Sequence, residues 1–293
     1  MPIQTLLQPR LTDLGGGMTV RRLLPAAARQ AVGPFVFFDH FGPVLHGPDS
    51  HTDVRPHPHI GLATVTYLFA GAMLHRDSLG TVQRIEPGAI NWMTAGRGIV
   101  HSERTPEDLQ AVPHTIHGLQ LWAALPLEDE ATEPAFAHTP AEAIPVWQDG
   151  GATVRVLIGS ACGLTSPVRT CAATLYLDVV LDPGASFTLA AEVEERAVYG
   201  VEGALEIDGQ GLDPHQLAAL EPGQPARIVA APGAAGPVRF AVIGGAPLEA
   251  RRFIWWNFVA SSKERIEAAK EDWRQRRFDP IPGETEFIPL PER

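Results

Sequence analysis

The sequence predicts an all-β protein built from two β-barrels in tandem. Short segments rich in β-branched and large apolar residues recur along the chain, each bounded by turn-forming residues. The 293 residues include 28 Gly and 27 Pro, scattered rather than clustered, which favours many strands joined by tight turns over long helices. One order of strands and turns is also repeated, so two copies of a single β unit are the economical interpretation.

The strand prediction depends on seven short segments with this composition. Their spacing is typical of an all-β sandwich or barrel, and no long amphipathic helix alternates with them, which argues against a doubly wound fold. The segments are residues 19–24, 61–69, 73–76, 118–125, 153–158, 174–181 and 238–243.

One short helix is predicted near the C-terminus. Ser261 and Glu264 match an S-x-x-E capping box, and Ile266, Ala269 and Trp273 follow at helical spacing. A Pro-rich tail, residues 279–293, comes next. We expect this tail to run extended over another surface and to hold the two halves together.

The internal repeat places the domain boundary. Residues 67–75 (YLFAGAMLH) resemble residues 199–207 (YGVEGALEI) at an offset of 132, and residues 85–89 (IEPGA) resemble residues 220–224 (LEPGQ) at an offset of 135. We therefore predict a metal-binding N-terminal barrel in 1–130. Residues 131–293 would hold a C-terminal barrel without metal ligands, together with the helix and the tail, which packs back on the body.

Composition restricts the partners. Net charge is −11, so the overall field repels nucleic-acid phosphates and anionic membranes, and neither is expected as a partner. Residues 1–10 lack the pattern of a signal peptide, and no apolar run approaches the length that spans a membrane. Cys162 and Cys171 match no zinc motif. We expect a cytoplasmic monomer.

Two short motifs in the first copy carry the predicted chemistry. His57 and His59 form an H-x-H pattern, and His101 and Glu103 form an H-x-E pattern. Residues two apart on a strand project from the same face, so four ligands converge if the two strands are neighbours. Imidazole and carboxylate ligands without thiolate suit iron, manganese, nickel, copper or zinc and disfavour a closed structural zinc site.

The second copy serves as an internal control for this site. At an offset of 132, His57 and His59 fall on Leu189 and Ala191. At an offset of 135, His101 and Glu103 fall on Gly236 and Val238. Since all four ligand positions lose their ligands together, one barrel is predicted to bind metal and the other is not.

The remaining histidines receive weaker assignments. His75 is expected to make a structural hydrogen bond, while His114 and His117 either line the mouth of the pocket or lie in a solvated loop. His51 and His138 are expected in loops.

At these motifs the sequence resembles the pirin family of the cupin superfamily. The resemblance spans nearly the whole chain, including the helix and the Pro-rich tail, and implies a bicupin fold with metal in the N-terminal barrel only. The matching stretches are residues 33–43 (GPFVFFDHFGP), 56–61 (PHPHIG), 64–67 (TVTY), 75–80 (HRDSLG), 92–103 (WMTAGRGIVHSE) and 118–122 (GLQLW).

The resemblance also implies ligands, a metal and two kinds of activity. The family's ligand positions correspond to His57, His59, His101 and Glu103, with Fe²⁺ as the usual metal and other divalent transition metals as alternatives. Members show quercetin 2,3-dioxygenase activity, and others bind protein partners such as transcription factors or metabolic enzymes. This chain departs from the common family pattern at Ile60 and Ala63, where many members have Arg and Glu.

Three functions therefore compete. The first is a Fe²⁺-dependent dioxygenase that opens a flavonol ring, with Glu103 as the catalytic group that accepts the proton of the substrate hydroxyl. The second is a non-enzymatic regulator, in which the oxidation state of the metal alters a surface that a partner protein recognises. The third is a metal-dependent isomerase or decarboxylase, because fold alone does not set function. It ranks last, since no obvious cluster of phosphate-binding Lys or Arg lies near the ligands, which counts against sugar-phosphate substrates.

Overall fold

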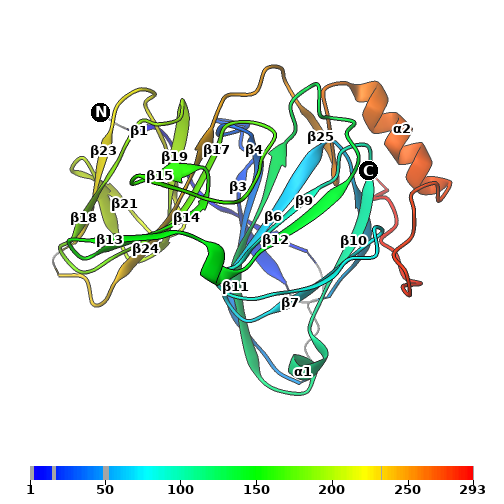
Figure 1. The fold of residues 1–293 in the computed structure, drawn as a ribbon, viewed down its shortest axis with the longest axis horizontal. Helices are drawn as coiled ribbons and strands as arrows, with labels where there is room; N and C mark the ends of the chain where they lie inside the picture. The colour runs from blue at the N-terminus through cyan, green and yellow to red at the C-terminus, as the bar shows by residue number, and fades with distance from the viewer. Residues whose placement is uncertain (1–2, 15–17, 49–52, 232, 293) are drawn as a thin grey trace. The chain divides into compact units, whose positions relative to one another are not determined.

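The structure is a computed structural model that describes residues 3–14, 18–48, 53–231 and 233–292 (Figure 1). The chain forms two compact units. Unit 1 comprises Met1–Leu11, Arg21–Phe38 and Glu142–Pro247, and unit 2 comprises Thr12–Val20, Asp39–Ala141 and Leu248–Arg293. No helix in the described part of the chain is long and apolar enough to cross a membrane. The predicted domain boundary after residue 130 stays a prediction.

The elements are nearly all strands, as the sequence predicts. Of the predicted segments, 19–24 and 174–181 coincide with β3 and β17, and the other five shift at their ends. In the first part of the chain the elements are β1 (Ile3–Leu7), β2 (Arg10–Asp13), β3 (Thr19–Leu24), β4 (Phe35–His46), β5 (Val54–His59), β6 (Leu62–Ala70), β7 (Met73–Asp77), β8 (Val82–Ile85), β9 (Ile90–Thr94), β10 (Ile99–Arg104), α1 (Glu107–Gln110), β11 (His114–Ala124) and β12 (Ala135–Thr139).

The second part of the chain continues in the same manner and ends in the single long helix. Its elements are η1 (Ala141–Ala143), β13 (Val146–Asp149), β14 (Ala152–Ile158), β15 (Ser160–Ala161), β16 (Leu164–Thr165), β17 (Thr174–Leu181), β18 (Ser186–Leu189), β19 (Glu195–Glu202), β20 (Leu205–Ile207), β21 (Gln210–Leu212), β22 (Leu217–Leu220), β23 (Ala226–Ala230), β24 (Val238–Gly245), β25 (Phe253–Trp255), β26 (Phe258–Ala260) and α2 (Lys263–Arg274).

The strand order confirms the internal repeat. A seven-stranded sheet with the order β12-β9-β6-β11-β4-β3-β2 has a counterpart with the order β1-β22-β19-β24-β17-β14-β13. A four-stranded sheet with the order β5-β10-β7-β8 likewise corresponds to β18-β23-β20-β21. The strands of each pair of sheets match one to one along the two orders, so the chain contains two copies of one β architecture.

The same topology corrects the second half of the sequence alignment. The Glu-Pro-Gly turn at 86–88 precedes β9, whereas the turn at 221–223 follows β22, the counterpart of β9. These two turns are therefore not equivalent, and the offset of 135 is wrong beyond them. The similarity arose because Glu-Pro-Gly favours a tight turn wherever a strand ends, with Gly88 and Gly223 both at positive φ.

Strand register supplies the correct counterparts of the ligand positions. His57 pairs with His101 between β5 and β10, and Leu189 pairs with Ala226 between β18 and β23. Glu103 pairs with His75, and its counterpart Ile228 pairs with Ile207. The counterparts of His101 and Glu103 are thus Ala226 and Ile228 rather than Gly236 and Val238.

Unit 1 has apolar side chains at the positions that carry three histidines and Glu103 in unit 2. Leu189, Ile207, Ala226 and Ile228 all belong to its main hydrophobic cluster. Apolar contacts and burial stabilise this barrel without an ion.

The helix α2 begins one residue later than the capping box predicts. Ser262 is the N-cap, and its hydroxyl accepts a hydrogen bond from the backbone N–H of Arg265. Ser261 instead donates its hydroxyl to Glu130 Oε2 at 2.7 Å. The helix buries Ile266 and Ala269 against a cluster that includes Phe258.

Candidate metal centre

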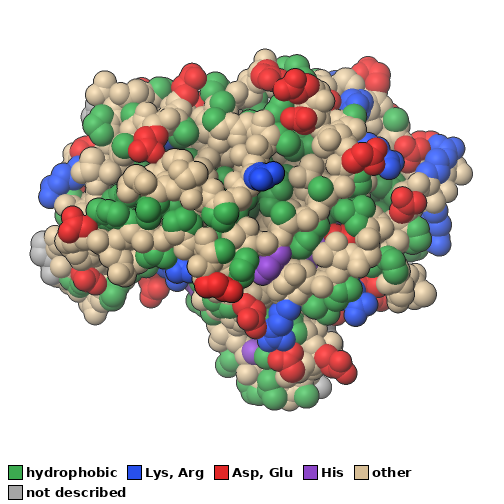
Figure 2. Space-filling view, in the orientation of Figure 1, with side chains coloured by type: hydrophobic (Ala, Val, Ile, Leu, Met, Phe, Trp, Pro, Cys, Tyr) green, Lys and Arg blue, Asp and Glu red, His purple; other side chains and the backbone are tan. Residues whose placement is uncertain are grey.

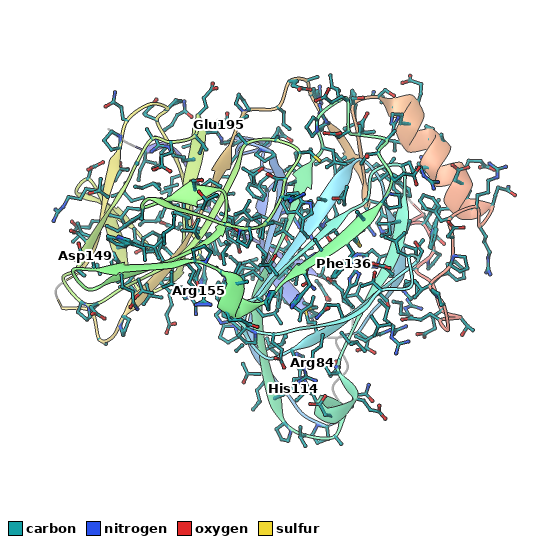
Figure 3. All side chains as sticks on the ribbon, in the orientation of Figure 1. Arg84, His114, Phe136, Asp149, Arg155 and Glu195 are labelled. Atoms are coloured by element: carbon teal, nitrogen blue, oxygen red, sulfur yellow. The ribbon has the colours of Figure 1, made fainter. Side chains whose placement is uncertain are left out.

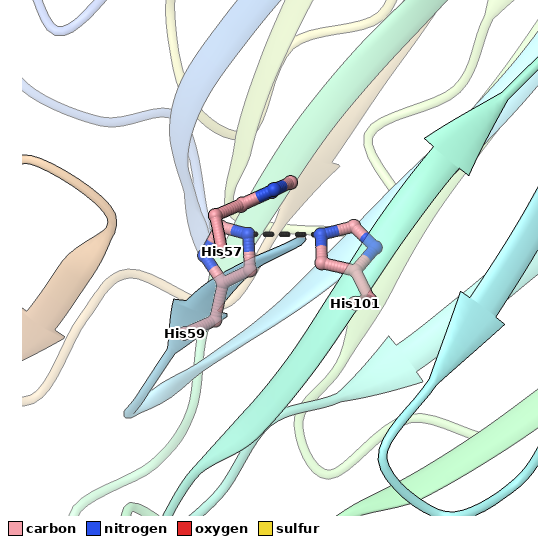
Figure 4. A group of neighbouring side chains, drawn as sticks. All are labelled: His57, His59 and His101. Carbon is pink, nitrogen blue, oxygen red and sulfur yellow. Dashed lines mark hydrogen bonds between the residues drawn. The ribbon is translucent and has the colours of Figure 1, made fainter. Parts of the chain in front are cut away.

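Two adjacent antiparallel strands carry the predicted ligands. In β5 and β10, His57 lies directly opposite His101 and His59 lies opposite Ile99. Alternation along β5 places His57 and His59 on one face, toward the side chain of His101. Figure 4 shows the three imidazole rings converging from these two strands.

The three rings are close enough to share one ion. Their nearest nitrogen atoms all lie within 4.8 Å of one another, and all three residues are buried. Ring centroids are 4.3 Å apart for His57 and His101, and 5.0 Å apart for His59 and His101. The Nε2 atoms of His59 and His101 are 3.1 Å apart.

Backbone carbonyls set the orientation of two of these rings. His57 donates Nδ1–H to the carbonyl of Arg55 at 2.9 Å, and His59 donates Nδ1–H to the carbonyl of Asn257 at 3.0 Å. Because a carbonyl oxygen can only accept, each ring carries its proton on Nδ1 and leaves the lone pair on Nε2 available. Such outer hydrogen bonds accompany metal-ligating histidines in general.

Burial keeps the cluster uncharged. It lowers the pKa of His57 to about 4 and lowers the pKa values of His59 and His101 well below their usual range. At neutral pH the rings are therefore neutral and offer lone pairs rather than protons. Neutral imidazoles at this separation fit a divalent cation, and the three histidines are among the four ligands predicted from the sequence.

Glu103 lies close to this cluster but outside the group of three. It occupies the same face of β10 as His101 and is 8% exposed. The pairing of β10 with β5 is irregular between His101 and Glu103, as in a β-bulge. Burial raises the pKa of Glu103 to about 7. Its role as a fourth ligand stays a prediction.

His75 and Asp77 are neighbours of the cluster that the ligand prediction missed. His75 Nε2 and Asp77 Oδ2 are 3.0 Å apart, which is the structural hydrogen bond expected for His75. The His75 ring lies 5.3 Å from that of His101 and stacks at 4.4 Å on Phe136, which Figure 3 labels. The H-x-D spacing on a strand next to β10 is the sequence signal that could have found this pair.

The other histidines correct some of the loop assignments. His138 lies in β12 and its Nδ1 is 2.6 Å from Asn91 Oδ1, whereas a loop was expected. His114 and His117 lie within β11, and His117 Nε2 is 2.7 Å from His40 Nε2. His51 lies outside the described residues. Each correction has the same cause, because strand ends rich in polar residues give little periodic signal.

The departures from the family pattern fall on buried positions. Ile60 belongs to the cluster beneath α2, and Ala63 is fully buried on β6. Neither position supplies a polar side chain in this chain.

The surface agrees with the acidic composition. On the face shown in Figure 2, acidic and basic side chains are interspersed. Among the described residues, His57, His59 and His101 form the only group of three or more side chains that could share a metal ion.

Two copies of a barrel with a buried histidine cluster in one of them define a bicupin. The chain belongs to the pirin family. The family described as Pirin matches residues 17–123, and the Pirin C-terminal cupin domain matches residues 176–279.

Individual relatives extend this match over the whole chain. A pirin-like protein of Caulobacter vibrioides is 44% identical over 99% of this chain and 100% of its own length. Pirin of Homo sapiens is 34% identical over 90% of this chain and 89% of its own length. The crystal structure of a quercetin 2,3-dioxygenase from Acinetobacter baumannii has a TM-score of 0.89 and 32% identity, covering 99% of this chain and 96% of that one.

Proposed function

We propose that this protein is a Fe²⁺-dependent dioxygenase that opens the ring of a flavonol such as quercetin, with loss of carbon monoxide. The observation that carries the proposal is the buried group of three neutral imidazoles with the buried carboxyl group of Glu103 beside it. The structural similarity to a quercetin 2,3-dioxygenase of Acinetobacter baumannii supports the substrate class. The metal ligands in this proposal are His57, His59, His101 and Glu103.

The residues of the chain have distinct tasks in this reaction. A bound Fe²⁺ would supply Lewis acidity and a template for the substrate and dioxygen. The hydrogen bonds from His57 and His59 to backbone carbonyls hold their Nε2 atoms in place. Glu103, whose pKa burial raises to about 7, is suited to accept the proton of the flavonol 3-hydroxyl at neutral pH.

Metal content and oxygen uptake test this proposal together. The protein is purified without added metal, bound metals are quantified, and oxygen consumption is followed with quercetin after reconstitution with Fe²⁺. We expect one ion per chain and turnover that disappears in His57→Ala. Glu103→Gln should lower turnover by about 10²- to 10⁴-fold, the usual contribution of a general base.

A matched control distinguishes the loss of a histidine of the cluster from the loss of any histidine. His114→Ala removes a histidine at the start of β11, outside the cluster, and should leave oxygen uptake unchanged. One ion per chain without oxygen uptake would contradict the dioxygenase and leave the site intact. A chain that binds no ion would contradict both.

One observation favours a second candidate, the regulator. Arg104 follows Glu103 directly, and its side chain is 18% exposed on the opposite face of β10. A shift of Glu103 at the ion would therefore move a residue that is partly exposed at the surface. The acidic chain would suit a partner protein with a basic patch. Partner affinity that is identical for the Fe²⁺ and Fe³⁺ forms would contradict this candidate.

A further inference from the structure

The C-terminal tail contacts the strand that carries two of the proposed ligands. Ser102 lies between His101 and Glu103 in β10 and is 0% exposed, although alternation turns its side chain away from theirs. Its hydroxyl donates to Glu284 Oε1 at 2.5 Å. A buried hydroxyl group between the two ligands is thus satisfied by a residue that is 182 positions away.

The same carboxylate holds a second residue of β10. Arg104 donates from Nη2 to Glu284 Oε2 at 2.5 Å and to Glu286 Oε2 at 2.8 Å. Burial raises the pKa of Glu284, but hydrogen bonds from Arg104 and Ser102 outweigh that effect and hold it below its usual value. Both oxygens of an ionised Glu284 therefore bind β10, one on each side of Glu103 in the sequence.

The tail also contacts the strand that carries the other two ligands. Ile288 donates its backbone N–H to the carbonyl of Pro56 at 2.8 Å, next to His57. Pro56 lies on β5, which is the edge strand of its four-stranded sheet. The indole of Trp273 in α2 holds the carbonyl of Ile288 at 3.0 Å. Figure 1 shows α2 and the red tail beside β10.

We propose that the tail segment 284–288 is a clamp that sets the geometry of the metal centre, with Glu284 as a positioning residue. Glu284 binds side chains on the outer face of β10 and Ile288 binds the backbone at the edge of β5, each next to a proposed ligand. The clamp keeps His57 opposite His101. It also keeps the Ser102 hydroxyl hydrogen-bonded on the outer face of β10. The inference rests on the proposed metal site and adds residues that do not contact the ion.

Glu284 lines a cavity, so its side chain can be substituted with little effect on packing. A cavity of about 550 Å³ lies between the tail and the outer faces of β7 and β10, and Arg76, Arg104 and Glu284 are among the residues that line it. Because open space adjoins the carboxylate, Glu284→Gln alters hydrogen bonding with little change in packing. The glutamine amide has one acceptor oxygen and no charge, so the charge-assisted bond from Arg104 is lost whichever way the amide turns.

Zinc affinity of the metal-free full chain is the test, measured by competition with a chromophoric chelator. Changes in the outer hydrogen bonds of metal sites weaken binding by about 10- to 100-fold, so Glu284→Gln should raise the Kd for Zn²⁺ by about tenfold. The midpoint of thermal unfolding of the metal-free protein is recorded in parallel. It should change little, which separates positioning from a general loss of stability.

Two further variants sharpen the result. Glu286→Gln is the matched control, because Glu286 also binds Arg104 but is 56% exposed and makes no bond to Ser102. It should leave the Kd within about twofold, as expected for an exposed ion pair. Ser102→Ala should weaken zinc binding as well, and it decides the question if Glu284→Gln fails to fold.

The double variant tests the route. If Glu284 acts through Ser102, the protein with both Glu284→Gln and Ser102→Ala should have a Kd for Zn²⁺ no higher than that of the single variant with the higher Kd. A folded Glu284→Gln protein with unchanged Kd overturns the clamp, as does simple addition of the two single effects. A wild-type chain that binds no zinc refutes the metal site itself, which is a different failure.

Discussion

Glu103 shows how one residue can be unfavourable for folding and useful for function. Folding places its carboxyl group where a negative charge is poorly solvated, and burial raises its pKa to about 7. A carboxyl group whose pKa is raised binds its proton more tightly in the folded state than in the unfolded state. Its contribution to stability is therefore fully present below the unfolded pKa, near 4.5, and is lost as pH rises through 7.

This shift predicts the pH dependence of Glu103→Gln in the metal-free protein. The variant should be more stable than the wild type by roughly 3 kcal/mol at pH 8.5, with no difference at pH 4, because the glutamine carries no charge to desolvate. Urea unfolding at the two pH values measures this. An equal difference at both pH values would show that packing, not charge, is responsible. With saturating Zn²⁺ the order should reverse at pH 8.5, because a nearby cation stabilises the carboxylate.

At the residue scale, the sequence was sufficient only for ligands that are close together along a strand. His57 and His59 are recognisable because alternation alone puts them on one face. The partners that orient the cluster come from far away: the carbonyl of Asn257 accepts from His59, and Glu284 accepts from Ser102. A backbone carbonyl has no sequence signature, so contacts of this kind could not be predicted.

At the element scale, the two copies show how the same strand frame can be filled in two ways. The proposed β10 ligands His101 and Glu103 correspond to Ala226 and Ile228 of β23, and the proposed β5 ligand His57 corresponds to Leu189. The sequence predicted that two copies of one β unit are present. It misplaced two counterparts, because loops of different length separate the strands and only backbone pairing shows which strands correspond.

The N-terminus of α2 yields a prediction at this scale. Glu130 is 4% exposed and accepts hydrogen bonds from the backbone N–H and the hydroxyl of Ser261. Glu130→Gln leaves one acceptor oxygen where Ser261 now has two, so it should destabilise the protein by about 2 kcal/mol. Urea unfolding measures the loss, and hydrogen exchange should show faster opening of the first turn of α2.

An exposed ion pair provides the control for that change. Glu133 pairs with Arg97 at 2.9 Å, but its side chain is 77% exposed. Glu133→Gln should change stability by less than about 1 kcal/mol, the usual limit for surface pairs. Similar losses in the two variants would contradict a specific role for Glu130 in holding α2.

At the scale of the whole molecule, the two units differ in what stabilises them. In unit 1, Leu189, Ala226 and Ile228 belong to a hydrophobic cluster, whereas the equivalent positions of unit 2 hold buried His57, His101 and Glu103. A ligand stabilises only the state that binds it. An ion at His57, His59 and His101 should therefore stabilise unit 2 and leave the intrinsic stability of unit 1 unchanged.

The tryptophans allow this difference to be measured, because only Trp147 of the six belongs to unit 1. In Trp147→Phe, fluorescence reports unit 2 alone, while far-UV circular dichroism reports both units. Zinc at a free concentration of 100 times its Kd should stabilise unit 2 by about 2.7 kcal/mol. The fluorescence midpoint in urea should then rise, and the dichroism transition should broaden or split, since each unit has its own core. His57→Leu, which copies the residue at the equivalent position of unit 1, should abolish the zinc effect. If fluorescence and dichroism shift together by the same amount, the two units unfold as one and their stabilities cannot be separated in this way.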